Sequence, residues 1–249
     1  MLGLIDIHNH LLPGMDDGSD SLETSLEMLK GAFQAGVTQI FVTPHLYFYD
    51  RLEETVTKAG RKLAELQLEI RRQGLSIQLY PGCEVFLHPE LPRLENLDRI
   101  TLGQKGEFIL VEVASGQIPN FVEKTCFDLL INGVTPILAH PERNLISTSQ
   151  LNILRKLSAQ GVVLQIEAAS YIGLNGKEMK KACQLLLTEN LAGIVASDAH
   201  NRKRNFEPMQ EACRQISKNF SEERANSLFC ANPEKILTAT GRQTNLKFK

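Results

Sequence analysis

Five of the six histidines in this 249-residue chain stand at or just beyond the ends of short apolar segments, and acidic residues occupy the same kind of position. Imidazole and carboxylate groups are ligands of Zn, Mn, Fe and similar divalent cations. Because about four protein groups saturate one ion, so many ligands predict two or three ions that share a bridging carboxylate. Paired ions suit hydrolysis of phosphate esters, since they hold both the attacking and the leaving oxygen. The residues in these positions are His8, His10, Asp16, Asp17, His45, Glu84, Glu112, His140, Glu167, Asp198 and His200.

Each of these residues taken alone has an ordinary interpretation. A pair such as His8 and His10 is more often structural than metal-binding, and a lone Glu after a strand is usually an exposed charge or a helper at a helix start. The same kinds of residue after seven segments of one chain are much less easily explained by chance. His88 follows no apolar segment of its own and is interpreted as a loop histidine.

Two arginines and three aromatic residues follow the candidate ligands. Arg143 and Arg204 carry guanidinium groups that could bind a phosphate held over the metals, with an exposed arginine near a helix end as the alternative. The aromatic rings could stack on an aromatic substrate group or could only pack a loop, and both interpretations stay open. These rings belong to Tyr47, Phe48 and Tyr49.

Seven short apolar or β-branched segments must position these side chains, and helical patterns separate most of them. Continuous apolar segments are typical of strands buried on both faces, as in a parallel sheet. Strands that alternate with helices predict right-handed βαβ units, and seven strands favour an incomplete barrel over an open doubly wound sheet. The C-terminal ends of barrel strands open onto one face, which would bring the ligands together. The segments are residues 4–7, 39–42, 77–80, 108–113, 136–139, 162–166 and 193–196.

The composition excludes several classes of protein. A hydrophobic content of 43% and a charged content of 22% exclude disordered and collagen-like chains, and a net charge of −2 lacks the basic footprint of a nucleic-acid-binding protein. No apolar run approaches the roughly 20 residues of a membrane helix. Five irregularly spaced cysteines indicate a reducing, cytoplasmic environment. We expect one domain over residues 1–240 and a flexible basic tail over 241–249.

Five motifs of the sequence resemble the polymerase and histidinol phosphatase (PHP) superfamily. More narrowly, they are similar to its CpsB/CapC branch, the manganese-dependent protein-tyrosine phosphatases of bacterial capsule and exopolysaccharide systems. The similarity extends to about Leu237. The motifs are residues 6–19 (DIHNHLLPGMDDGS), 43–45 (TPH), 82–84 (GCE), 140–143 (HPER) and 197–201 (SDAHN).

The resemblance implies an α/β fold, a distorted seven-stranded (β/α)7 TIM-like barrel, with up to three divalent ions. Manganese is the metal that the family suggests, with Fe, Zn, Co or Mg as alternatives. Arg143 matches a family arginine that contacts phosphate, and Arg204 stands near a second one. Glu167 departs from the neutral polar residue that the family suggests at its position. The implied ligands are His8, His10, Glu84 and Asp198 for the first ion, Glu84, Glu112 and His140 for the second, and Asp16, His45 and His200 for the third.

The activity that the resemblance implies is hydrolysis of phosphotyrosine by a metal-activated hydroxide, without a covalent phosphoenzyme. The implied substrate is the tail of an autophosphorylating bacterial tyrosine kinase that controls polysaccharide export, with no nucleic-acid partner and no membrane insertion. The alternatives are a PHP phosphoesterase acting on a small molecule such as histidinol phosphate, and a binding module that holds metal structurally and docks a kinase. A nucleic-acid exonuclease is the least favoured alternative.

Overall fold

Parallel strands form two hydrogen-bonded sheets in the computed structural model, which describes residues 3–145, 147–240 and 248. The pairing is parallel throughout. The first sheet has the order β1 (Leu4–Asp6), β2 (Val37–Val42), β4 (Gln78–Pro81), and the second has the order β3 (His45–Leu46), β5 (Glu84–Phe86), β6 (Phe108–Glu112), β7 (Thr135–Ala139), β8 (Val163–Glu167), β9 (Ala192–Ala196).

Two of the seven predicted strands are interrupted, which explains why the sheets are separate. Thr43 and Pro44 lie between β2 and β3, and Pro44 has no N–H to donate to a ladder. Gly82 lies between β4 and β5, where a Cβ atom would stand 2.8 Å from Leu102. The short strands β3 and β5 therefore extend β2 and β4. The prediction of an α/β barrel with seven strand positions is confirmed.

The first and last strands meet beyond their ends. The Asp198 N–H donates to the His8 carbonyl at 2.9 Å, and the His10 N–H donates to the Ala199 carbonyl at 2.7 Å. Asn9 and Ala199 form an isolated parallel bridge. These contacts place the segment that follows β9 beside the segment that follows β1.

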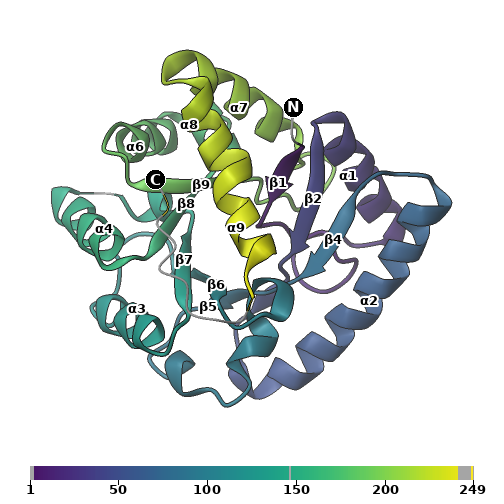
Figure 1. Cartoon of the computed structure of the whole chain (residues 1–249), viewed down its shortest axis with the longest axis horizontal. Helices are drawn as coiled ribbons and strands as arrows, with labels where there is room; N and C mark the ends of the chain where they lie inside the picture. Colours follow the sequence, from purple (N-terminus) through teal and green to yellow (C-terminus); the bar gives the residue numbers. More distant parts are fainter. Residues whose placement is uncertain (1–2, 146, 241–247, 249) are drawn as a thin grey trace.

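Helices surround the strands, and α9 lies across one end of the barrel (Figure 1). Ser21 and Ser147 cap α1 and α4 by accepting a backbone N–H of the first turn. A π-helical turn, η6 (Ser227–Ala231), joins α8 to α9. The helices are α1 (Leu22–Gln34), α2 (Leu52–Arg72), α3 (Val122–Ile131), α4 (Thr148–Gln160), α5 (Ala168–Ile172), α6 (Lys177–Thr188), α7 (Glu207–Asn219), α8 (Glu222–Asn226) and α9 (Asn232–Thr238). The 3₁₀ turns are η1 (Tyr49–Arg51), η2 (Leu91–Arg93), η3 (Leu97–Ile100), η4 (Leu102–Gln104) and η5 (Pro141–Asn144).

The hydrophobic core has two parts, one on each face of the strands. Phe108 and Leu110 of β6 belong to a cluster that also contains Ile5 and Ile194, whereas the alternate residues Ile109 and Val111 belong to the larger cluster that includes the helices. Both faces of a strand are therefore buried, which explains why the strand segments are continuously apolar.

The C-terminal end of the chain contributes to the smaller cluster. Ile236 of α9 is buried there, and Phe248 packs edge-on against Phe108 with ring centroids 5.7 Å apart. Residues 241–247 and 249 of the predicted basic tail lie outside the described residues. In the part of the chain that the structure describes, no helix combines the length and the apolar character needed to cross a membrane.

Candidate metal centre

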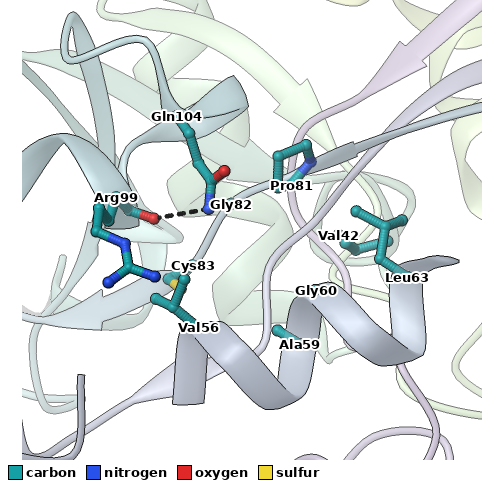
Figure 2. A pocket seen from close by; sticks show the side chains of 10 residues that line it. All are labelled: Val42, Val56, Ala59, Gly60, Leu63, Pro81, Gly82, Cys83, Arg99 and Gln104. Carbon is teal, nitrogen blue, oxygen red and sulfur yellow. Dashed lines mark hydrogen bonds between the residues drawn. The ribbon is translucent and has the colours of Figure 1, made fainter. Parts of the chain in front are cut away.

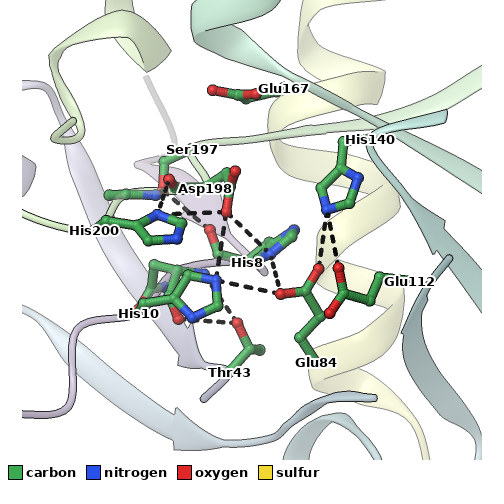
Figure 3. Close-up of polar contacts among 12 residues, drawn as sticks. His8, His10, Thr43, Glu84, Glu112, His140, Glu167, Ser197, Asp198 and His200 are labelled. Atoms are coloured by element: carbon green, nitrogen blue, oxygen red, sulfur yellow. Dashed lines mark hydrogen bonds and ion pairs between the residues drawn. The ribbon is translucent and has the colours of Figure 1, made fainter. Parts of the chain in front are cut away.

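The predicted ligands gather at one end of the barrel because each stands at or just after a strand end. His8 and His10 follow β1, and Glu112 is the last residue of β6. His45 and Glu84 begin the short extensions β3 and β5. The remaining ones, His140, Asp198 and His200, follow β7 and β9. Figure 3 shows the labelled side chains of this set directed toward one another, namely those of His8, His10, Glu84, Glu112, His140, Asp198 and His200.

Glu84 lies at the centre of the cluster and is 1% exposed. Its Oε2 is 3.0 Å from Nε2 of His8, 3.2 Å from Nε2 of His10 and 3.2 Å from Nδ1 of His45. Its Oε1 is 3.0 Å from Nε2 of His140. A single carboxylate thus faces four imidazoles, which is the position that a bridging ligand requires.

Two further carboxylates complete the inner part of the cluster. Oδ1 of Asp198 is 3.2 Å from Nε2 of His8 and 3.4 Å from Nε2 of His10. Oε1 of Glu112 is 3.1 Å from Nδ1 of His45. Four overlapping groups of ligand atoms, each within 4.8 Å of one another, result: His10, Asp17, His45 and His200; His8, His10 and Asp198; His8, Glu84 and His140; and His45, Glu84 and Glu112.

Several ligand atoms of the cluster are buried without a hydrogen bond. They are Nε2 of His8, Nε2 of His10, Nδ1 of His45, Oε2 of Glu84 and Oε1 of Glu112. Their contacts with one another, at 3.0 to 3.2 Å, are not counted as hydrogen bonds, which is unfavourable for buried polar atoms, and the atoms converge from different strands on the same space. Divalent cations would satisfy nitrogen and oxygen atoms together, so the residues present fit a metal centre.

Hydrogen bonds on the far side of the rings orient two of the histidines. Nδ1 of His8 is 2.8 Å from Oε1 of Gln165, and Nδ1 of His200 is 2.8 Å from the carbonyl of Asp198. Such bonds leave Nε2 of each ring for a metal. Gln165 was not predicted from the sequence, although a polar residue inside the otherwise apolar segment 162–166 was a signal for it.

The neighbouring residues Asp16 and Asp17 have different positions. Oδ2 of Asp16 lies 2.8 Å from Nδ1 of His10 and accepts the backbone N–H of His45 at 3.0 Å. Asp17 is mostly exposed, and its Oδ1 is 3.5 Å from Nε2 of His45 and 3.6 Å from Nε2 of His200. The sequence-based assignment grouped Asp16 with His45 and His200, whereas the structure groups Asp17 with them. Asp16 instead orients the ring of His10.

The carboxylates raise the pKa values of the inner imidazoles in the metal-free protein. Burial by itself lowers the pKa of His8, but Glu84 and Asp198 outweigh it and raise the pKa to about 9. The pKa of His10 is also raised, since Asp16, Asp198 and Glu84 outweigh its burial. Both shifts favour the protonated rings, so protons compete with cations for these nitrogen atoms. His200 is the opposite case, because its burial and the charge on His10 lower its pKa to about 4.

Both predicted arginines lie against the cluster. Nη2 of Arg143 donates to Oδ2 of Asp198 at 2.5 Å and to Oε2 of Glu167 at 3.0 Å. Nη2 of Arg204 donates to the same Asp198 oxygen at 2.9 Å. Their guanidinium groups are partly exposed, so both stand between the buried carboxylates and solvent.

Glu167 supports an arginine and belongs to none of the ligand groups found among the described residues. It is 1% exposed, and besides the Arg143 guanidinium it accepts Nδ2 of Asn175 at 2.8 Å and Oγ of Ser170 at 3.1 Å. Figure 3 shows it apart from the inner carboxylates. Its position is that of a residue that orients Arg143.

The three consecutive aromatic residues differ in their surroundings. The ring of Tyr47 stacks on His45, with centroids 4.6 Å apart and an interplanar angle of 25°. The hydroxyl of Tyr49 donates to the Phe86 carbonyl at 2.6 Å, so this ring packs the loop. Phe48 is mostly exposed. His88 is an exposed residue that belongs to none of the ligand groups within the described ranges, as its interpretation as a loop histidine requires.

A separate cavity of about 130 Å³ lies between α2 and the interrupted strands (Figure 2). Gly60 and Leu63 of α2 line one side of it, and Pro81 and Cys83 line the other. Burial raises the pKa of the Cys83 thiol to about 12. Histidine and acidic residues do not line this cavity, so it is distinct from the metal centre.

Known proteins resemble this chain over almost its whole length. Residues 4–238 match the family described as "Capsular polysaccharide synthesis, CpsB/CapC". Tyrosine-protein phosphatase YwqE of Bacillus subtilis is 34% identical over 223 residues, which cover 88% of this chain and 86% of YwqE. Tyrosine-protein phosphatase CpsB of Streptococcus pneumoniae is 29% identical over 244 residues, which cover 94% of this chain and 98% of that protein.

Solved structures agree with this relationship. A structure from the crystal study of YwqE from Bacillus subtilis and CpsB from Streptococcus pneumoniae, described as metal-dependent tyrosine phosphatases, has a TM-score of 0.85 and 31% identity, covering 98% of this chain and 96% of that one. A histidinol phosphate phosphatase from Lactococcus lactis has a TM-score of 0.58 and 16% identity, covering 88% and 94%. The second match shows a shared fold alone.

Proposed function

Because the chain belongs to the CpsB/CapC family, we propose that it is a metal-dependent protein-tyrosine phosphatase. The observation that carries the proposal is the set of buried ligand atoms without hydrogen bonds that converge beside two arginines. The names of YwqE and CpsB as tyrosine-protein phosphatases support the same activity.

The proposed ligands form three sets of residues, of which the first two share Glu84. When bound, the ions supply Lewis acidity and lower the pKa of a water molecule. Two to three divalent cations are proposed, with manganese first and Fe, Zn, Co or Mg as alternatives, since mixed nitrogen and oxygen ligands accept them all. The sets are His8, His10, Glu84 and Asp198; Glu84, Glu112 and His140; and Asp17, His45 and His200.

The arginines bind the phosphoryl group in this proposal. Arg143 and Arg204 both contact Oδ2 of Asp198, and each guanidinium can offer further N–H groups to phosphate oxygens. Glu167 keeps Arg143 in place. The positive charge of Arg143 is therefore already oriented toward the entrance of the site when substrate arrives. Tyrosinate is a fairly good leaving group because phenol has a pKa near 10, so strong general-acid assistance is not required.

We also propose the phosphorylated tail of a bacterial tyrosine kinase as the substrate, in a cytoplasmic system for capsule or exopolysaccharide synthesis. The family description supports the polysaccharide context. Partial exposure of Arg204 and Asp17 at the mouth supports access by a protein chain. The described cysteines are all free thiols, which is compatible with a reducing compartment.

The proposal is tested with purified protein, manganese and a phosphotyrosine peptide. Asp198→Ala removes a carboxylate that contacts three histidines and two arginines, so we expect turnover to fall by roughly a thousandfold or more. Circular dichroism checks that the fold is kept. Full activity of Asp198→Ala with unchanged metal content would refute the site. Faster turnover of histidinol phosphate than of phosphotyrosine peptide would favour the small-molecule alternative instead.

A further inference from the structure

An exposed tyrosine ring stands one aromatic ring away from the metal centre. Tyr47 stacks on His45 with centroids 4.6 Å apart and remains 50% exposed. Atoms on two edges of the His45 ring face the cluster, since Nδ1 is 3.2 Å from Glu84 and Nε2 is 3.5 Å from Asp17. One face of Tyr47 is therefore held by a residue of the centre, while half of its side-chain surface remains open to solvent.

The aromatic ring of an aryl phosphate lies close to its phosphorus atom. In phosphotyrosine, a single oxygen joins phosphorus to the ring, so the ring must lie beside the centre when the phosphate is within it. Phe86 lies on another side of Tyr47, with centroids 6.2 Å apart and an interplanar angle of 52°. Aromatic rings favour offset-stacked or tilted packing at such distances. An alkyl phosphate would gain much less binding free energy from the rings of Tyr47 and Phe86.

We propose that Tyr47 is a specificity residue on which the aromatic ring of a phosphotyrosine substrate packs. The inference rests on the proposed phosphatase function and states which ester group the site prefers. Tyr49 does not have this role, because its hydroxyl binds the Phe86 carbonyl and its ring packs the loop. The selectivity arises from the ring of Tyr47 and not from its hydroxyl.

Phosphonates that cannot be hydrolysed separate ring binding from chemistry. We would measure inhibition constants of phenylphosphonate and methylphosphonate for manganese-loaded wild type, Tyr47→Leu and Tyr47→Phe. Loss of one aromatic contact in Tyr47→Leu should raise the inhibition constant of phenylphosphonate by roughly threefold to tenfold. The inhibition constant of methylphosphonate should stay within about twofold of the wild-type value. Tyr47→Phe keeps the ring and should bind both phosphonates like wild type. Phe127→Leu, which alters a similarly exposed ring on α3, is the matched control and should change neither constant.

The outcomes distinguish failure of this inference from failure of the proposed function. Equal weakening of both phosphonates in Tyr47→Leu, with or without loss of metal, would show that Tyr47 acts only through His45 and would overturn the inference. Unchanged phenylphosphonate binding in that variant would overturn it as well. In both cases wild-type hydrolysis of phosphotyrosine peptide would leave the phosphatase function standing, whereas absence of that hydrolysis would remove the function itself.

Discussion

Adjacent side chains have different tasks around the metal centre. Asp16 is hydrogen-bonded to His10 and to the backbone of His45, while Asp17 reaches toward His45 and His200. In the proposed site, Asp17 is a ligand and Asp16 orients a ligand, as carboxylates behind metal-binding histidines often do. The difference between the two roles can be measured.

Metal content separates the roles of Asp16 and Asp17. Asp17→Asn should lower the bound manganese by about one ion per chain, because the set of Asp17, His45 and His200 loses its only carboxylate. Asp16→Asn keeps an oxygen that can accept from His10, so the stoichiometry should remain and the affinity should fall by roughly 10- to 100-fold. Elemental analysis and metal titration would check both. Loss of an ion in Asp16→Asn alone would restore the sequence-based assignment.

Glu167→Gln tests the support of Arg143. The substitution removes the charge of a buried carboxylate that accepts from the partly exposed Arg143 guanidinium, so kcat/KM for a phosphotyrosine peptide should fall by roughly tenfold. Inhibition by inorganic phosphate should weaken in parallel, since the arginine is proposed to bind phosphate. Ser170→Ala removes only a neutral hydrogen bond to the same carboxylate and serves as the control. An unchanged phosphate inhibition constant in Glu167→Gln would show that Arg143 needs no such support.

The strand ends aim the ligands at the centre through unusual backbone geometry. His140 and Asp198 have φ values of 34° and 50°, in the left-handed region that non-glycine residues rarely adopt. Each stands just after a strand, where the chain turns sharply and directs the side chain over the barrel mouth. Such conformations persist where the surrounding structure imposes them, often at functional sites.

Two glycines allow this backbone argument to be tested on stability, away from the ligands. Gly60 lies inside α2 and Gly36 lies after α1 with a φ of 81°, and a Cβ atom would meet nothing within 4 Å at either position. Gly60→Ala should raise the free energy of unfolding by about 0.5–1 kcal/mol. Gly36→Ala should lower it by about 1–2 kcal/mol, because only its backbone conformation is unfavourable for alanine. Urea denaturation would measure both, and equal shifts of the same sign would contradict the explanation.

On the scale of the whole molecule, buried hydrogen bonds join the first strand of the barrel to the segment that follows the last strand. Asp6 of β1 accepts the Ser197 N–H at 2.7 Å and the Ser197 hydroxyl at 2.9 Å, which ties β1 to the segment after β9. Burial raises the pKa of Asp6 to about 6 despite these hydrogen bonds. The metal centre lies across this junction, since His8 and Asp198 come from its two sides.

Metal removal should therefore lower the stability of the whole barrel. We expect the metal-stripped protein to remain folded and manganese to raise its Tm, because a cation binds the native state alone. The Tm increase should be larger at pH 8 than at pH 6. The pKa of His8 is about 9 in the metal-free protein, so protons compete more strongly for its ring as the pH falls. Differential scanning fluorimetry at fixed manganese would measure the shift, and a larger increase at pH 6 would contradict the assignment of His8.

The sequence by itself determined the class of fold and the kinds of residue at the site. Continuous apolar segments indicated strands buried on both faces, and the structure has them. The positions of His8, His45 and Asp198 next to strand ends predicted that they meet, because parallel barrel strands all end on one face. This inference needed only the hydrophobic periodicity and the order of the segments, which can be obtained from the sequence without knowing any tertiary contact.

Tertiary structure alone decided which atoms face one another. Whether Asp16 or Asp17 meets His200 depends on how the loop after β1 turns, and Gln165 becomes a partner of His8 only when β8 lies beside the barrel interior. The role of Glu167 likewise follows from contact with Arg143, a residue from a different loop. Distances across the barrel arise from the packing of seven strand positions together, and so no single segment of the chain encodes them.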